Sequence, residues 1–315
     1  MCGPQTVVGI KRIAESALDG EHKLLVSIER GAIMHASRSR RVFSRRRTAC
    51  MHVCARLQVV IEASDFDGLV AEADAVSVDG WDFSWLHGRA TEQRPSWGYT
   101  RMLVPRVERA RCLLDAQTGG AEVLVEVLDR AQSRPSTIAA TECWGPNVAI
   151  ARRNLTHLGG IVVEVANDDL FPFPDGMFDL VVSRHPVVNR WDEIARVLDP
   201  GGRYFAQRVG PGSNRELTDC VMGAQLIPDT RSAAKAVADA AGHGMDVVDL
   251  REESLRVEFY DIGAVVYFLR KVIWTVPDFT VERYRDRLAA LHERIRADGV
   301  FVSHAQRFLI ELRKA

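Results

Sequence analysis

The chain has 315 residues, 47% of them hydrophobic, and its 41 Lys and Arg nearly balance its 42 Asp and Glu. This length accommodates one large domain with a full core, or a domain with an appendage. No apolar run approaches the roughly 18 residues of a membrane-spanning helix, and the six cysteines do not form the framework of a disulfide-rich secreted domain. We therefore expect a cytoplasmic protein without a membrane partner.

Residues 1–60 differ from the remainder in charge. Residues 1–56 contain 11 Lys and Arg against 4 Asp and Glu, and six arginines fall between positions 38 and 47. Such a run is typical of a nucleic-acid-binding arm or a targeting presequence, but like-charge runs usually remain solvated. We expect residues 1–60 to be a basic, disordered or dispensable extension and residues 61–315 to form the folded domain. The acidic balance of that domain disfavours a dedicated nucleic-acid-binding protein.

Cys50, His52 and Cys54 are close enough in sequence to share a metal ion. A structural zinc site needs four ligands, however, and no second pair of Cys or His follows at a suitable spacing. We therefore predict no metal site.

The first predicted elements of the folded domain form a helical N-terminal cap over residues 61–111. A capped amphipathic helix is expected over 64–76, an aromatic loop over 80–86, and a second helix from about Trp97. Trp97 and Tyr99 open that second helix, where they either close over a ligand or pack against the core.

From residue 112 onward, strands and helices alternate regularly. The pattern predicts helices over 121–131, 146–158 and 191–198, between strands over 112–116, 137–141, 161–166, 178–183 and 203–209. Strand–helix–strand units of these lengths form parallel sheets with helices on both faces. We therefore predict a Rossmann-like, doubly wound α/β fold whose ligand-binding core is residues 112–210.

Residues 211–315 complete the predicted sheet. They are expected to form a helix over 230–242, a strand over 246–251, helices over 262–274 and 280–298, and a last strand over 301–313, with 256–261 as a candidate short strand. The helical excursion 251–299 would lie over the carboxyl edge of the sheet, where open α/β sheets bind ligands. The predicted sheet has seven mostly parallel strands with an antiparallel last strand, plus helical N-terminal and C-terminal cap elements.

Two strand ends carry the pattern of a nucleoside-binding unit. The first strand ends in Asp115 and passes through Gly119 and Gly120 into a helix, so backbone N–H groups and a helix N-terminus face the ligand. The second strand ends in Glu142, where an acid is placed to accept hydrogen bonds from ribose hydroxyls. These features alone do not identify the nucleoside.

Three segments, together with Glu142, resemble class I S-adenosylmethionine-dependent methyltransferases. They are Leu113–Ala121, Asn167–Ser183 and Trp191–Gly202. The last two are similar to the strand-four segment LPF-DGSFDLV and the E-RVLKPGG turn of the ubiquinone/menaquinone-type branch of that family. The resemblance covers residues 112–209 and, more broadly, 61–315, and it implies S-adenosylmethionine as the cofactor.

The resemblance implies a cofactor site along the carboxyl ends of the first strands. Glu142 would hold the ribose, Asp115 would lie near the methionine amine, and Asn167 or Asp168 would contact the adenine amine. The implied cofactor-binding residues are Asp115, Ala116, Gln117, Thr118, Gly119, Glu142, Cys143, Asn167, Asp168, Asp169 and Ser183.

This chain departs from the Asp-x-Gly-x-Gly-x-Gly pattern that the family usually shows. Gln117 and Ala121 occupy the first and third glycine positions. Gln117 could weaken cofactor binding or hydrogen-bond the cofactor. A protein of this fold that binds the cofactor without turnover is therefore an alternative.

The acceptor candidates follow the fourth and fifth strands or open the cap. His185 is a candidate general base, because imidazole titrates near neutrality, but direct methyl transfer does not demand a base. Tyr260, Tyr267 and Trp274 are either a hydrophobic acceptor surface or core. The candidate substrate residues are Trp97, Tyr99, Arg184 and Arg208.

Missing motifs narrow the reaction. No Asn-Pro-Pro-Tyr-like motif follows the fourth strand and no Cys follows a Pro, which argues against N6-adenine and cytosine-C5 methylation. The Gly-x-Gly-x-x-Gly spacing of a nicotinamide dehydrogenase is also missing. We expect a small-molecule acceptor, with RNA as the alternative because some similar family members modify ribosomal RNA.

Overall fold

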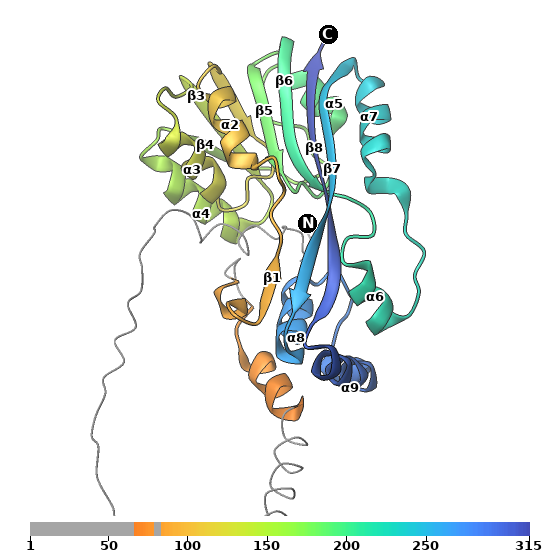
Figure 1. Cartoon of the computed structure of the whole chain (residues 1–315). Coiled ribbons are helices and arrows are strands. Elements are labelled where there is room, and N and C mark those ends of the chain that lie inside the picture. Colours follow the sequence, from red (N-terminus) through yellow and green to blue (C-terminus); the bar gives the residue numbers. More distant parts are fainter. Residues whose placement is uncertain (1–65, 79–82) are drawn as a thin grey trace, which may run out of the picture.

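The computed structural model describes residues 66–78 and 83–315. Its centre is an eight-stranded sheet in the order β1-β7-β8-β6-β5-β2-β3-β4 (Figure 1). The strands are β1 (Ala90–Glu92), β2 (Cys112–Asp115), β3 (Thr137–Glu142), β4 (Ile161–Glu164), β5 (Phe178–Arg184), β6 (Leu198–Val209), β7 (Met245–Phe259) and β8 (Phe301–Lys314). Strands β2 to β6 are parallel, β8 is antiparallel to both β6 and β7, and β1 is antiparallel to β7. The predicted doubly wound, mostly parallel fold is confirmed.

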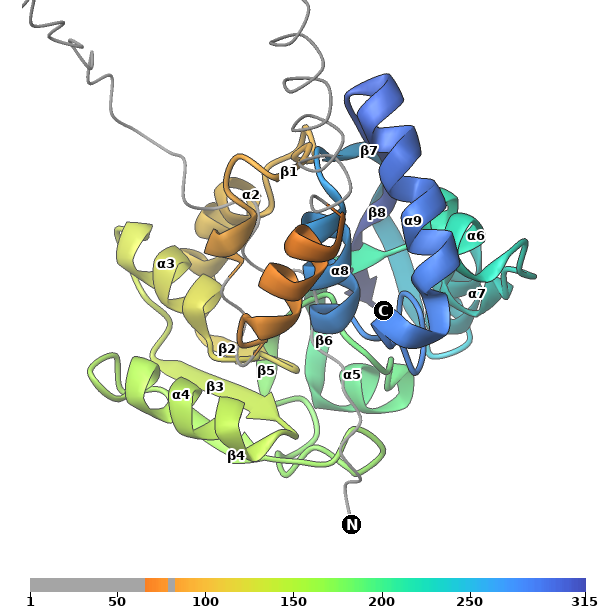
Figure 2. The same ribbon diagram turned by 90° about the horizontal axis from the view of Figure 1, so that it is seen from below.

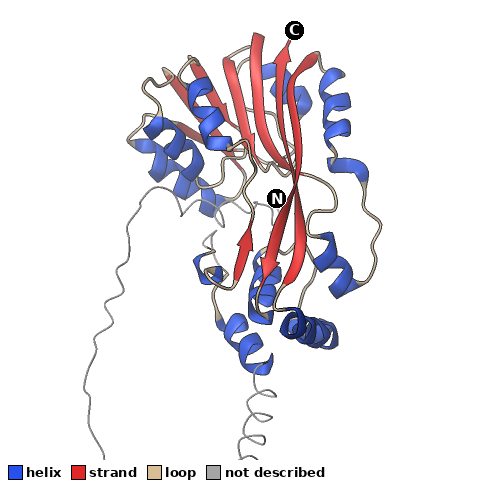
Figure 3. Ribbon diagram, viewed as in Figure 1, coloured by secondary structure: helices blue, strands red, loops and turns tan. Residues whose placement is uncertain are grey.

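The helices lie on both sides of this sheet (Figure 3). A helix over 66–75 precedes the others. The helices after it are η1 (Ser84–Leu86), α2 (Tyr99–Val107), α3 (Glu122–Arg130), α4 (Gly145–Thr156), α5 (Trp191–Val197), α6 (Arg215–Met222), η2 (Asp229–Arg231), α7 (Ala233–Ala241), α8 (Ile262–Lys271) and α9 (Val281–Asp298).

Alternation along the strands separates two cores. Leu113 and Leu180 face a cluster that includes α2, α3 and α4, whereas Leu114 and Val181 face a cluster that includes α5 and α7. Successive residues of a strand point to opposite faces, so a run of consecutive apolar residues supplies both layers. This pattern explains why the strands from β2 to β6 could be predicted.

A third core lies beyond the carboxyl edge of the sheet, the edge at which β2 to β6 end. Val209, the last residue of β6, pairs with Arg307, but β7 and β8 stay paired as far as Phe259 and Phe301. Figures 1 and 2 show this two-stranded extension with α8 and α9 packed around it. We call it the arm; its core also includes Val70 and Leu86 from the N-terminal cap.

The structure differs from the prediction in three elements. β7 is continuous through Phe259, so the helical excursion starts at Ile262 rather than at residue 251. The three-residue β1 adds an eighth strand at the edge, and α6 was not predicted. The residues predicted to form the basic extension, and the Cys50, His52 and Cys54 group, lie outside the described residues. The domain boundaries stay predictions.

The sheet order places a topological switch point between β2 and β5. The chain runs outward from β2 to β3 and β4, then returns to form β5 on the other side of β2. Connections leave the carboxyl ends of β2 and β5 in opposite directions, and ligands of open α/β sheets bind in the crevice that this creates.

Candidate functional site

The turn from β2 into α3 has left-handed backbone conformations that favour glycine, although two of the three residues there are not glycine. Gln117, Gly119 and Ala121 have φ angles of 58°, 67° and 62°. A residue with a β-carbon loses roughly 1–2 kcal/mol in this left-handed region. Thr118 stabilises the turn, because its hydroxyl donates to Asp115 Oδ2 at 2.5 Å and its backbone N–H donates to the Thr141 carbonyl at 2.9 Å.

Glu142 sits at the carboxyl end of β3 with its carboxylate turned toward this turn. The side chain is buried, at 2% exposure. Its Oε2 accepts the backbone N–H of Gly119 at 2.7 Å, and its Oε1 accepts that of Trp144 at 3.1 Å. A carboxylate has about four lone-pair sites, so two remain for a pair of hydroxyls. As an acceptor for two further hydrogen bonds, the carboxylate therefore fits the paired hydroxyls of a ribose.

Gln117 bridges the switch point. Its Oε1 accepts the backbone N–H of Val187 at 2.7 Å, and its Nε2 donates to the carbonyl of Val188 at 2.6 Å. The side chain at the first glycine position thus ties the β2 turn to the segment that follows β5. Where a glycine would leave this turn flexible, the Gln117 side chain links it by hydrogen bonds to residues 187 and 188.

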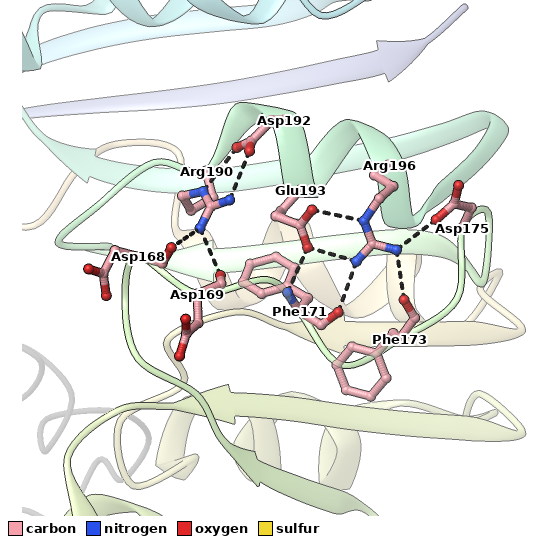
Figure 4. A network of polar contacts seen from close by, with 9 residues as sticks. All are labelled: Asp168, Asp169, Phe171, Phe173, Asp175, Arg190, Asp192, Glu193 and Arg196. Carbon is pink, nitrogen blue, oxygen red and sulfur yellow. Dashed lines mark hydrogen bonds and ion pairs between the residues drawn. The ribbon is translucent and has the colours of Figure 1, made fainter. Parts of the chain in front are cut away.

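The acidic segment after β4 is held through its backbone. Arg190 Nη1 donates to the carbonyls of Asp168 and Asp169, at 2.5 and 2.8 Å, and its guanidinium pairs with Asp192 (Figure 4). This pairing lowers the pKa of Asp192 from 3.8 to about 2. The carboxylates of Asp168 and Asp169 are not used in these contacts and both residues are exposed, while Asn167 is half-buried. The structure therefore leaves these side chains at the surface.

Arg196 completes the clamp on this segment. Its guanidinium contacts Glu193 and Asp175 and donates to the carbonyls of Phe171 and Phe173 (Figure 4). Glu193 in turn accepts the backbone N–H of Phe171 at 2.6 Å, and Arg196 holds the pKa of Glu193 below its usual value. Residues 168–175 are therefore fastened to α5 by two arginines.

A chain of hydrogen bonds orients His185. Trp97 Nε1, which can only donate, lies 2.9 Å from Gln207 Oε1, and the Gln207 amide nitrogen lies 2.9 Å from His185 Nε2. Because the amide nitrogen donates, Nε2 is the accepting nitrogen and Nδ1 carries the proton in neutral His185. His185 has a left-handed backbone, with φ 55°, and is buried beside the end of β5.

The other predicted residues are spread over the two faces of the sheet. Ser183 is buried, with its hydroxyl 2.6 Å from the Tyr204 hydroxyl. Tyr99 stacks on Phe205 with ring centroids 5.2 Å apart, and burial raises the pKa of Tyr99 well above its usual value. Ala116 is buried in the turn, and Cys143 is half-buried after β3.

Two neighbouring cavities, which share part of their lining, lie beyond β5 and β6. The smaller, of about 30 Å³, is lined by His185, Pro186, Val187, Asn189, Arg208, Val209, Arg231 and Trp274. The larger, of about 480 Å³, shares Val209, Arg231 and Trp274 with it and extends between α6 and residues 272–277. The lining of the larger cavity is mainly apolar, including Met222, Ile227 and Pro228.

Arg184 and Arg208 do not meet. Arg184 and Gln207 are paired in register and line a separate groove of about 580 Å³ beside α2 and α3. Arg208 follows Gln207 and points to the opposite face, because side chains alternate along a strand. The structure therefore assigns the two arginines to different surfaces.

Sequence reasoning missed Gln207, Asn189 and Arg231 at this site. The signal for Gln207 was available, since it is a polar residue directly after the apolar run of residues 204–206, and a buried amide needs partners. Asn189 and Arg231 lie in connecting segments whose approach to β6 depends on the fold. Trp274, which was left open as acceptor surface or core, lines both cavities.

Residues 66–78 and 83–315 contain neither a cluster of metal-ligating side chains nor a helix that could cross a membrane. No group of three or more His, Cys, Asp or Glu side chains suited to a metal ion occurs there. No helix in the same ranges combines the length and the hydropathy needed to cross a membrane.

Comparison with known proteins gives one match by sequence. Residues 114–206 match a family model described as a methyltransferase domain. That range runs from β2 to β6 and includes Asp115, Gln117, Glu142 and His185. No curated protein matches the chain in sequence.

Solved structures show similarity at low identity. The YcgJ protein from Bacillus subtilis is 14% identical, with a TM-score of 0.48, and the match covers 69% of this chain and 97% of that one. An S-adenosylmethionine-dependent methyltransferase from Mesorhizobium loti is 14% identical, with a TM-score of 0.42 and coverage of 69% and 97%. A geranyl diphosphate methyltransferase in complex with GPP and sinefungin is 15% identical, with a TM-score of 0.43 and coverage of 69% and 77%.

Proposed function

The chain contains a class I S-adenosylmethionine-dependent methyltransferase domain, with S-adenosylmethionine as its cofactor, and on that premise we propose that it methylates a small-molecule acceptor by direct transfer. The observation that carries this proposal is the pair of cavities beyond β5 and β6. Together they offer about 30 and 480 Å³ at the edge where the sheet binds ligands, which suits a small molecule with an apolar body.

The residues at the β2 and β3 ends fit the cofactor that the family uses. When bound, S-adenosylmethionine supplies an electrophilic methyl group on a sulfonium. Glu142 has two free lone-pair sites for the ribose hydroxyls, and Asp115 at the end of β2 supplies a carboxylate for the methionine amine. Gln117 fixes the segment after β5 against the turn, so both halves of the site keep one geometry.

His185 is proposed to act at the acceptor side. It lines the smaller cavity, and the Trp97–Gln207 chain sets its tautomer. With Nε2 accepting from Gln207, the protonated Nδ1 suits a hydrogen-bond donor to the acceptor. The general-base role stays a prediction and requires that the Gln207 contact be exchanged, because a base needs an accepting nitrogen at the substrate.

Two alternatives remain part of the proposal. RNA as acceptor is disfavoured by the apolar lining of the larger cavity. A cofactor-binding protein without turnover is the alternative that the altered glycine positions, Gln117 and Ala121, permit. The cytoplasmic location and the ubiquinone/menaquinone-type branch also stay proposals.

One labelling experiment tests the reaction and the acceptor class. Purified protein is incubated with S-adenosylmethionine carrying a radioactive methyl group, together with a low-molecular-mass cell extract or with total RNA. Label in extracted small molecules is the expected result. Label in RNA would replace the acceptor class, and cofactor binding without labelling of either pool would favour the non-catalytic alternative.

A further inference from the structure

Arg208 is a buried cation that has no ion-pair partner among the residues that the structure describes. It lies next to the end of β6, and only 4% of the residue is exposed. Its guanidinium lies over the rings of Trp191 and Phe308, 5.2 Å from each centroid. Within 66–78 and 83–315 no carboxylate forms an ion pair with it, and its Nη1 has no hydrogen-bond partner.

The two rings offset the charge only in part, and no carboxylate of residues 66–78 and 83–315 lies within ion-pair distance of it. Asp239 on α7 attracts it from beyond ion-pair distance, while Arg231 at the cavity rim repels it. Burial lowers the pKa of Arg208, but a guanidinium remains protonated at neutral pH. A buried charge without an ion-pair partner destabilises the folded state, and an opposite charge that joins it removes this penalty. Folding therefore retains Arg208 at a cost.

The position of Arg208 places this charge where a ligand can neutralise it. Arg208 lines the smaller cavity together with His185, at the edge where the acceptor is proposed to bind. Asn189 lines the same cavity, and its buried Oδ1 has no donor. Turning the Asn189 amide over would direct N–H groups toward an anion there.

We propose that Arg208 binds a carboxylate group of the acceptor, whose apolar remainder occupies the larger cavity. The planar guanidinium matches a carboxylate through two parallel hydrogen bonds. One buried cation in a space of about 30 Å³ suits a small monoanion better than a larger, doubly charged phosphate. The acceptor class is then an amphipathic carboxylic acid. That the bound carboxylic acid is the methyl acceptor rests on the proposed function, but the anion site itself can be tested without turnover.

The test measures thermal melting of the full chain with sodium acetate, sodium benzoate, inorganic phosphate or sodium chloride at matched ionic strength. Because a ligand that binds only the folded state stabilises it, acetate should raise the melting temperature above the chloride value. Benzoate should raise it further, since its ring reaches apolar surface. Phosphate stabilises folded proteins in general, so its effect should be the same with and without Arg208.

Arg208→Met separates the site from a general salt effect. This variant should lose the carboxylate-dependent rise, and without added carboxylate it should melt no lower than the wild type, because the unpaired charge is gone. Arg231→Met, at the exposed rim, should keep most of the rise. Should Arg208→Met fail to fold by circular dichroism, Arg208→Lys replaces it: a lysine keeps the charge but loses the planar fork, so the acetate response should fall.

Several results would overturn the inference. They are equal responses to acetate and chloride, an unchanged acetate response in the folded Arg208 variant, or a phosphate response that this variant loses to a greater extent than the acetate response. Titration with S-adenosylmethionine on the same samples keeps the two proposals apart. Lost cofactor binding with an intact carboxylate response would contradict the proposed function alone, and the reverse pattern would contradict this inference alone.

Discussion

The two halves of the carboxyl edge treat their polar groups differently. At the β2 and β3 ends, Glu142 accepts two backbone N–H groups, and Asp115 accepts the Thr118 hydroxyl. At the β6 end, Arg208 has no carboxylate partner among the residues that the structure describes. The first half is organised by the protein's own backbone, as suits a cofactor bound in one way. In the second half, the charge of Arg208 is left for the carboxylate of the proposed acceptor.

The two halves also differ in how far the family match covers them. The matched residues 114–206 include the whole cofactor half. Arg231, Trp274 and most of the larger cavity lie after that range. Specificity is therefore to be sought in α6, in residues 225–231 and in residues 272–277, and the predictions below challenge this division.

The largest effect is expected at Glu142. Glu142→Ala removes the carboxylate that the ribose needs and leaves the N–H groups of Gly119 and Trp144 without their acceptor, so cofactor affinity should fall about 100-fold. Calorimetric titration with S-adenosylmethionine and S-adenosylhomocysteine measures this loss. Glu164→Ala is the matched control, because Glu164 pairs with Glu142 in register but is exposed. Equal affinities in the two variants would remove Glu142 from the site.

A smaller effect is expected at Trp97. Trp97→Phe keeps an aromatic ring but removes the donor to Gln207, so the buried amide oxygen loses its partner at a cost of about 1–3 kcal/mol. The Gln207 amide can then turn over, and His185 should show both neutral tautomers in nitrogen NMR spectra of the ring. Trp144→Phe, at a tryptophan that is 44% exposed, should leave the spectra unchanged. A single unchanged tautomer in Trp97→Phe would show that the chain does not orient His185.

Gln117 offers a third test, at the boundary between the halves. Gln117→Gly relieves the left-handed backbone but breaks both bonds to the segment after β5, so the net change in stability should stay within about 1 kcal/mol. Exchange of the Val187 amide hydrogen should nevertheless become about tenfold faster, because its acceptor is lost. Ala121→Gly relieves the same kind of backbone strain without touching that segment. If Ala121→Gly accelerated exchange at Val187 equally, the bridge would not be the cause.

The smallest effect is expected on stability at low pH, through Asp192. The pKa of Asp192 falls from 3.8 to about 2 on folding, so its pairing with Arg190 stabilises the protein above about pH 4 and is lost as the pH falls through 2. Asp192 is half exposed, so the contribution is small. Fluorescence of Trp191, the neighbouring residue, should stay constant from pH 7 to pH 4 and change below about pH 3. Asp192→Asn should weaken that pH dependence; an unaltered profile would assign it to another group.

The sequence predicted those parts of the fold whose pattern is local. Strands β2 to β6 are short apolar runs between recognisable turns, and each appears within a few residues of its predicted bounds. β1 could not be found in this way, because three residues carry no period and its partner Phe259 is far along the chain. β7 was divided in two because Glu252 and Glu253 interrupt its apolar pattern, which an edge strand tolerates.

The site was predictable to the level of strand ends but not of contacts. Asp115, Glu142 and His185 lie at the ends where the pattern placed them. That Gln117 would cross to Val188, or that Glu142 would be covered, depends on how segments far apart in sequence approach each other. Arg184 and Arg208 were grouped as substrate residues, although register and alternation send them to opposite faces.

The position of β8 has a consequence for how the protein folds. β8 is the one strand that joins β6 to β7, and it also forms half of the arm. During synthesis β6 is complete long before Phe301 is made, and until then its outer edge has no partner. Unpaired edges invite association between chains, and distant pairings slow folding. We expect this protein to depend on low concentration or chaperones when it is refolded, and expression to be sensitive to changes in β8 that leave the cofactor half intact.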